Sequence, residues 1–97
     1  MNNIERLKSV IRDLHGCDTT YVQSVPVHET IQGKVVWNGD VEVFLLVDHS
    51  RAKRAYGWSY TNAFGQLRHM VVLGVPPINS AVDAVRASIG LESQSLP

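Results

Sequence analysis

Cysteine is almost absent from the sequence, and this limits the chemistry open to the chain. Cys17 is the only cysteine among 97 residues, so no disulfide can form within the chain. The four histidines have no second thiol near them at the spacing of a zinc site. A lone thiol without a neighbouring base carries no signature of a nucleophile. We therefore predict no metal, no cofactor and a reducing, cytoplasmic location.

Net charge and long apolar runs are missing as well. Nine basic and nine acidic side chains cancel, which removes the whole-molecule attraction for polyphosphate that many nucleic-acid-binding proteins have. No apolar run approaches the roughly 20 residues that span a bilayer, and the first residues lack the pattern of a signal peptide. Because 44% of the residues are apolar, we expect a globular protein that does not enter a membrane.

Hydrophobic periodicity predicts a helix near each end of the chain. Residues 4–14 place apolar side chains at helical spacing, and Gly16 can adopt the left-handed conformation that ends a helix. Near the other end, Ser80 and Asp83 form a capping-box pattern. Gly90 is expected to end this second helix.

The middle of the chain has the alternation of antiparallel strands. Apolar residues recur with period two over residues 35–47, which is the strongest strand signal present. Asn38-Gly39 lies within this segment and is typical of a two-residue hairpin turn, yet the alternation continues through it in phase. A hairpin turn and a bulge in one long strand both remain open. Residues 18–34 contain Pro26, which cannot donate to a ladder, so an edge strand or an extended arm is expected there.

Two further strands complete the predicted fold. They cover residues 53–61 and 67–75 and form a hairpin around a turn at 62–65. The order helix, three or four antiparallel strands, helix predicts an α+β two-layer sandwich with both helices on one face of the sheet. A chain of this length holds one core, so we predict a single domain over residues 1–90 and a flexible tail over 91–97.

This element order resembles the double-stranded-RNA-binding domain over residues 4–89. That family grips RNA partly through a lysine cluster at the start of its last helix, whereas this helix starts with the sequence NSAVD at residues 79–83. The resemblance therefore implies the topology and no binding residues. Small uncharacterised bacterial proteins of structural-genomics origin are also similar, in the segments WNGDVEVF at 37–44 and AYGW at 55–58. That resemblance implies no activity.

One segment combines basic and aromatic side chains. Its candidate binding residues are His49, Arg51, Lys53, Arg54, Tyr56, Trp58 and Tyr60. Basic side chains can follow a nucleic-acid backbone and aromatic faces stack bases at roughly 1–3 kcal/mol each, so this segment is the best nucleic-acid candidate. The opposite face of the strand carries only Ala55, Gly57 and Ser59. Because these are too small to form a core, the alternative is that the aromatic side chains pack beneath the helices.

The strongest strands are apolar on both faces. Val43 and Leu45 alternate with Phe44 and Leu46, whereas an open antiparallel sheet normally presents a polar face to water. If both helices lie on one side, the other side must be covered by the segment 21–32 or by another subunit. This pattern suggests a homodimer, or a protein partner, on an apolar sheet face.

These observations favour a non-enzymatic protein-interaction or homo-oligomerising module. A nucleic-acid-binding domain is the first alternative, and a small enzyme with a composite site is the second. His28-Glu29 and Asp48-His49 place an imidazole beside a carboxylate in sequence, but neighbours on a strand point to opposite faces. There is no glycine-rich phosphate loop, nucleophile elbow or metal-binding acidic cluster, so we assign no catalytic and no metal-binding residues.

Overall fold

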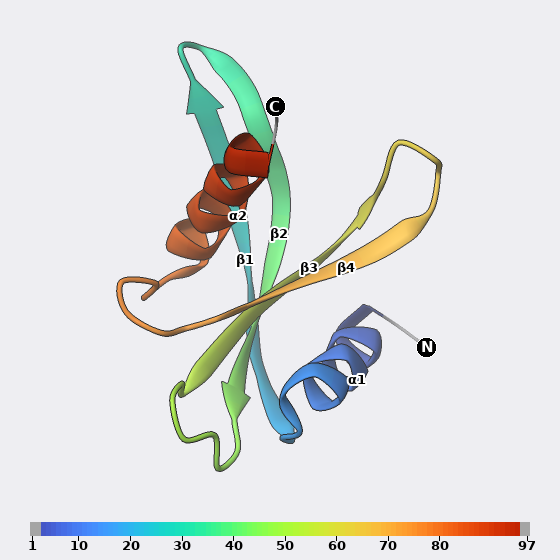
Figure 1. Cartoon of the computed structure of the whole chain (residues 1–97), viewed down its shortest axis with the longest axis vertical. Helices are drawn as coiled ribbons and strands as arrows, with labels where there is room; N and C mark the ends of the chain where they lie inside the picture. Colours follow the sequence, from blue (N-terminus) through green and yellow to red (C-terminus); the bar gives the residue numbers. More distant parts are fainter. Residues whose placement is uncertain (1–2, 96–97) are drawn as a thin grey trace.

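Residues 3–95 are described by the structure, which is a computed structural model. The elements follow in the order α1 (Asn3–His15), β1 (Thr19–Ile31), β2 (Lys34–Leu46), β3 (Arg54–Thr61), β4 (Leu67–Leu73) and α2 (Ala81–Ser95). The strands form one antiparallel sheet in sequence order (Figure 1). The predicted α+β class is confirmed, and the sheet has four strands.

The sheet consists of two hairpins that cross. β1 pairs with β2 along almost its whole length, and β3 pairs with β4 over residues 55–61 and 67–73. In contrast, β2 and β3 pair only over residues 42–45 and 54–57. The ordinary twist of a sheet therefore turns one hairpin strongly relative to the other, and their tips project separately in Figure 1.

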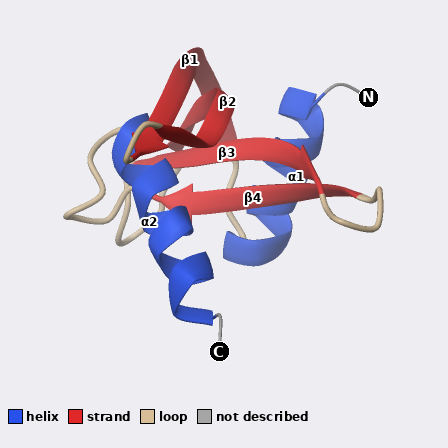
Figure 2. Ribbon diagram, turned by 90° about the horizontal axis from the view of Figure 1, so that it is seen from above, coloured by secondary structure: helices blue, strands red, loops and turns tan. Residues whose placement is uncertain are grey.

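The two helices lie on opposite faces of this sheet, which corrects the expectation that they share one face. Leu7 of α1 belongs to the same buried cluster as Ala55, whereas Val85 of α2 belongs to the cluster of Tyr56. Ala55 and Tyr56 are adjacent in β3, and adjacent strand residues point to opposite faces. Figure 2 shows the same arrangement, with α2 in front of β3 and β4 and α1 behind them.

This placement overturns the premise, two helices on one face, from which a partner on an apolar sheet face was predicted. α1 covers its face around Phe44, which is fully buried. Farther along the same face the side chains are polar and bond to each other: Ser24 donates to Glu42 over 3.1 Å, and His28 lies 3.2 Å from Asn38. One helix therefore packs on each face of the sheet, and the polar remainder of the α1 face is suited to water.

The long hairpin turns at a different place from the Asn38-Gly39 pair. Asn38-Gly39 lies inside β2, which is one continuous strand. The turn is made by Gln32-Gly33, where both residues have positive φ, at 52° and 78°, as a type I′ hairpin turn requires. The register shifts fall at Val22 and Val36 and not at Asn38-Gly39. β1 is an edge strand that includes Pro26, which confirms that alternative.

The two helices end differently from each other. The backbone N–H of Gly16, at φ 66°, donates to the carbonyl of Arg12 over 2.8 Å, which confirms the predicted end of α1. Gly90 does not end α2, which continues to Ser95 where a tail was expected. Glycine lowers helix propensity by about 1 kcal/mol but does not forbid the helical conformation. Residues 96–97 of the predicted tail lie outside the described residues.

Candidate binding groove at the start of α2

The predicted aromatic stripe lies mostly in the core. Tyr56 is 2% exposed and Trp58 is 4% exposed. The ring of Trp37 packs edge-to-face on that of Trp58, with 5.4 Å between the ring centroids. Tyr60 is 42% exposed. The alternative that placed these rings under a helix is therefore right for Tyr56 and Trp58, and a three-ring stacking platform is not accessible at the surface.

The first part of the predicted segment shapes a loop. The Nδ1 atom of His49 accepts backbone N–H groups from Arg51, over 3.1 Å, and from Ala52, over 3.0 Å. The ring of His49 also meets that of His15 edge-on, with centroids 6.0 Å apart. His49 thus holds the connection between β2 and β3. Its position is explained by these contacts without a ligand.

The next residues of the segment line a groove where α2 begins. Two adjoining hollows of about 230 and 260 Å³ share Arg54, Tyr56 and Asn79. The first is also lined by Gln23, Val25, Val43, Ser80, Ala81 and Val82, and the second by Lys53, Gly74 and Ile78. We call the two hollows together the α2 groove. It brings Lys53, Arg54 and Tyr56 together, as the sequence predicts, and leaves out Trp58 and Tyr60.

Tyr56 presents an unpaired hydroxyl to the α2 groove. The residue is almost wholly buried, and its hydroxyl forms no hydrogen bond with any described residue. Among the described residues no side-chain nitrogen or oxygen is both fully shielded and unpaired. The hydroxyl must therefore reach solvent, and the α2 groove is where Tyr56 lines the surface. It is a donor on a fixed ring and has no partner within the described part of the chain.

The first turn of α2 forms another wall of the groove. Asp83 donates its N–H to Ser80 Oγ over 3.1 Å, which confirms Ser80 as the cap of α2. The carboxylate of Asp83 accepts the N–H of Asn79 over 3.1 Å, one residue before the position that a capping box uses. The N–H groups of Ala81 and Val82 have no acceptor within a helix at these positions. They add the partial positive charge of a helix N-terminus to the groove.

The charge around the groove is positive. Lys53 and Arg54 are exposed and take no part in the two ion pairs found among the described residues, which join Arg12 to Asp18 and Arg86 to Glu29. The first turn of α2 contributes one carboxylate, from Asp83, which is already engaged as a cap. The two cations therefore exceed the one anion by a single charge in this region.

An apolar surface lies beside these donors. Val25, Val43 and Val82 line the groove itself. Leu45 is directly opposite Arg54 in the β2–β3 register and is 41% exposed, and residues opposite each other share a face of the sheet. The α2 groove therefore combines a positive, hydrogen-bonding end with an apolar floor. No histidine, aspartate or glutamate is among its lining residues.

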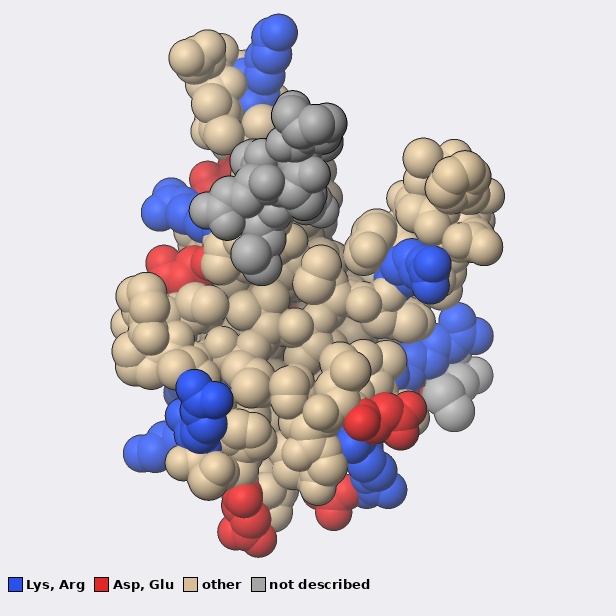
Figure 3. Space-filling model, in the orientation of Figure 1, with Lys and Arg blue, Asp and Glu red and all other residues tan. Residues whose placement is uncertain are grey.

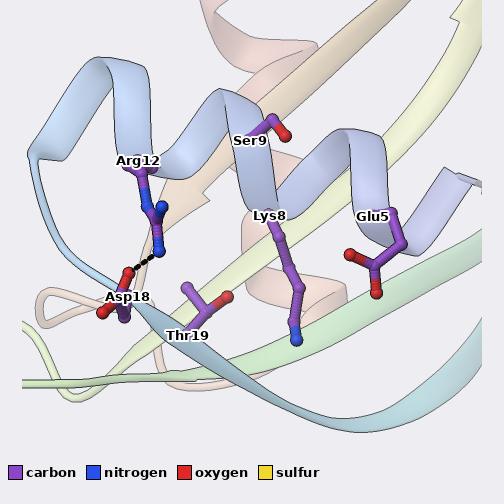
Figure 4. Close-up of a pocket in the computed structure, with 6 residues that line it drawn as sticks. All are labelled: Glu5, Lys8, Ser9, Arg12, Asp18 and Thr19. Carbon is purple, nitrogen blue, oxygen red and sulfur yellow. Dashed lines mark hydrogen bonds and ion pairs between the residues drawn. The ribbon is translucent and has the colours of Figure 1, made fainter. Parts of the chain in front are cut away.

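The charged residues elsewhere are mixed in sign. In Figure 3, basic and acidic side chains alternate around the margin of the face shown, and its middle carries neither. A larger hollow of about 280 Å³ lies beside α1 and is lined by Glu5, Lys8, Ser9, Arg12, Asp18 and Thr19. Figure 4 shows Arg12 directed at Asp18 in this hollow. Its two cations are matched by two carboxylates and none of its residues is buried, so it has no counterpart of the buried Tyr56 that lines the α2 groove.

Three uncharged polar residues of the groove, Gln23, Asn79 and Ser80, had no functional signal in the sequence. Ser80 was recognisable as a helix cap, but Gln23 and Asn79 resemble ordinary surface residues. Gln23 reaches the groove because it pairs with Val43, which in turn pairs with Tyr56. Such proximity depends on strand register, and the register shift at Val22 sets it.

Comparisons with known proteins identify no relative. Protein-family models, curated proteins and solved structures each gave no match to this chain. Over the described residues, no three histidine, cysteine, aspartate or glutamate side chains are placed to hold a metal ion. Neither described helix has the length and apolar content needed to cross a bilayer. The function must therefore be inferred from the groove itself.

Proposed function

We propose that the protein is a non-enzymatic interaction module whose α2 groove binds the C-terminal carboxylate and last apolar side chain of a protein partner. The observation that carries this proposal is the hydroxyl of Tyr56, which has no hydrogen-bond partner among the described residues. Tyr56 lines the groove together with Arg54 and the start of α2. The ring of Tyr56 is held in the core, and its hydroxyl reaches the surface without an acceptor among the described residues. A ligand that accepts its hydrogen bond explains why the hydroxyl is there.

The donors of the groove match a carboxylate. A guanidinium group offers two parallel N–H donors to the two oxygens of a carboxylate, and Arg54 is free to do so. The hydroxyl of Tyr56 and the N–H groups of the first turn of α2 can donate to the same oxygens. Capture of chain termini by clustered backbone donors is a recurrent mode of peptide recognition.

The apolar floor selects what precedes the carboxylate. Val25, Val43 and Val82 lie in the same hollow as the donors, and the exposed side of Leu45 continues this surface beside Arg54. Burial of a side chain the size of valine or leucine contributes about 1.5–3 kcal/mol. A partner that ends in such a residue therefore gains binding free energy from the hydrogen-bond donors and from the apolar floor of the groove.

Binding fits the lining residues better than catalysis does. Histidine is the most common general base or acid, followed by the carboxylic acids, and the described lining residues include neither; their titratable side chains are those of Lys53, Arg54 and Tyr56. The remaining alternative is nucleic acid. Arg51, Lys53 and Arg54 stay exposed, but two of the three rings proposed to stack bases, Tyr56 and Trp58, are buried.

The test uses acetylated heptapeptides that end in leucine, valine or phenylalanine, each as the free acid and as the C-terminal amide. We expect the acids to bind at least about tenfold more tightly than the amides, a difference of roughly 1.4 kcal/mol. Fluorescence anisotropy measures the affinity. Amide shifts at Ala81 and Val82 in nuclear magnetic resonance spectra locate the site.

Tyr56→Phe is the sharpest variant, because it removes only an unpaired hydroxyl. We expect unchanged stability and affinity for the acids lowered by about one to two orders of magnitude, as for loss of a hydrogen bond to a charged group, worth roughly 1.5–3 kcal/mol. Arg68→Gln, on β4 and outside the groove, is the control for loss of positive charge. Equal binding of acids and amides would contradict the proposal. Tight, strongly salt-dependent binding of single-stranded oligonucleotides that Tyr56→Phe leaves unchanged would favour the nucleic-acid alternative.

A further inference from the structure

The two hollows of the α2 groove differ in what they offer a ligand. The first, of about 230 Å³, has a floor of three valine side chains. The second, of about 260 Å³, has one apolar side chain besides the ring of Tyr56 among its described lining residues, that of Ile78. It also adds Lys53, which does not line the first hollow. The second hollow is therefore the more polar and the more positive of the two.

Gly74 holds the end of β4 against residues that both hollows share. Its N–H donates to the carbonyl of Arg54 over 2.8 Å. A β-carbon built at Gly74 would lie 3.0 Å from that carbonyl oxygen and 3.3 Å from Cε2 of Tyr56. Because glycine has no such atom, the backbone at this point can lie directly against both residues. The second hollow is therefore backed by a firm contact between β3 and the end of β4.

Lys53 is a cation without an anionic partner among the described residues. It is exposed, and neither of the two ion pairs found in the described part of the chain includes it. Its carbonyl accepts the N–H of Leu46 over 2.8 Å, so its backbone is tied to the end of β2. The sequence has no aspartate or glutamate over residues 49–82. The charge of Lys53 is therefore available to a ligand in the second hollow.

Asn79 supplies an uncharged donor to the same hollow. Its backbone N–H donates to Asp83 over 3.1 Å, while its side-chain amide forms no hydrogen bond with a described residue. The carboxylate of Asp83 lines neither hollow, and in the first turn of α2 it offsets the partial positive charge of the helix N-terminus. The described lining of the second hollow thus joins a cation and an amide donor without a carboxylate. This combination favours an anionic group in the ligand.

We propose that the second hollow binds an acidic side chain at the penultimate position of the partner, so that the preferred partner ends in glutamate or aspartate followed by an apolar residue. It rests on the proposed function, in which Arg54 and Tyr56 hold the terminal carboxylate and the valine floor holds the last side chain. Successive side chains of an extended peptide point to opposite sides. A last side chain in the first hollow therefore directs the penultimate one toward the second. Lys53 is the specificity-determining residue.

The exposure of Lys53 sets the size of the effect. An ion pair at an exposed lysine raises affinity by a factor of about two to five, and added salt weakens it. A lysine at the penultimate position of the partner should be disfavoured to a similar degree, because two like charges would share one hollow. Electrostatic complementarity of this kind contributes more to the choice of partner than to the strength of binding.

Acetylated heptapeptide acids that end in glutamate-leucine, glutamine-leucine and lysine-leucine test the role of Lys53. Fluorescence anisotropy at low ionic strength should show the glutamate peptide binding about twofold to fivefold more tightly than the glutamine peptide, and the lysine peptide binding most weakly. Lys53→Glu should reverse the order of the glutamate and lysine peptides. The matched control is Lys34→Glu, which makes the same change of charge at an exposed position of β2 outside both hollows and should keep the wild-type order.

C-terminal amides of the same peptides separate this inference from the proposed function. If the acids bind more tightly than the amides but the glutamate and glutamine acids bind equally, the acidic preference is overturned and the proposed function stands. If no acid binds more tightly than its amide, both are overturned. A preference for glutamate that persists unchanged in Lys53→Glu would also overturn the inference, because the acidic side chain would then bind elsewhere.

Discussion

Leu7 of α1 lies directly over Gly57 of β3: a β-carbon built at Gly57 would be 3.1 Å from Leu7 Cδ2 and 3.4 Å from the carbonyl oxygen of Met70. Gly57 stands between Tyr56 and Trp58, whose rings point to the opposite face and pack beneath α2. The missing side chain at Gly57 therefore lets α1 approach the sheet closely. This contact seats α1 on the face opposite α2.

A double-mutant cycle tests this contact. Gly57→Val should destabilise the fold by about 1–3 kcal/mol, because the added methyl groups press on Leu7. In a Leu7→Ala background the same substitution should cost less, with a coupling energy of at least about 0.5 kcal/mol. Urea unfolding followed by tryptophan fluorescence measures the four free energies. Strictly additive effects would mean that Leu7 does not lie over Gly57.

The aromatic side chains provide a second prediction. Trp58→Ala should lower the free energy of unfolding by roughly 3–5 kcal/mol, because Trp58 is buried and supports Trp37. Phe64→Ala is the control, since Phe64 is 88% exposed at the tip of the β3–β4 hairpin, and it should change stability by less than about 0.5 kcal/mol. If Trp58→Ala keeps full stability but abolishes binding to single-stranded nucleic acid, the ring is a stacking surface and not core.

Local patterns in the sequence predict the elements but not how they meet. Helical periodicity identifies both helices, and Gly16 and the Ser80–Asp83 pair mark ends that the structure confirms. Periodicity shows which side of a helix is buried, but it does not show which face of a sheet the helix covers. The signal was nevertheless present in Val43 and Phe44, because apolar residues at successive strand positions are typical of a sheet covered on both sides.

Tertiary contacts also override the turn preference of Asn38-Gly39. A β-carbon at Gly39 would be 3.3 Å from the ring of Trp37, so glycine serves here to let that ring lie across the strand toward Trp58.

The α2 groove was only partly predictable. Lys53, Arg54 and Tyr56 lie within four positions of each other in the sequence, so they could be predicted as one candidate binding segment. Their proximity to the start of α2 follows from packing across the sheet, which the sequence does not show.

The polar part of the α1 face predicts an effect of pH. The pKa of Tyr21 is raised above its usual value of 10.0, chiefly because its hydroxyl donates a hydrogen bond to Glu42, with partial desolvation and the negative charge of Glu42 acting in the same direction. The hydrogen bond to Glu42 Oε2 is 2.8 Å long. Because the folded state favours the neutral phenol, its stabilising contribution is complete below pH 10.0 and is lost as the pH rises through the folded-state pKa.

Glu42→Gln isolates the role of the carboxylate. The amide oxygen can still accept the hydrogen bond, but the charge is gone, so the pKa of Tyr21 should fall toward its usual value. Ultraviolet titration of phenolate formation measures the change, and the difference between wild type and Tyr21→Phe assigns the signal to Tyr21. An unchanged pKa in Glu42→Gln would mean that the charge of Glu42 does not act on Tyr21. The hydroxyl would then have to owe its raised pKa to the neutral hydrogen bond and desolvation alone.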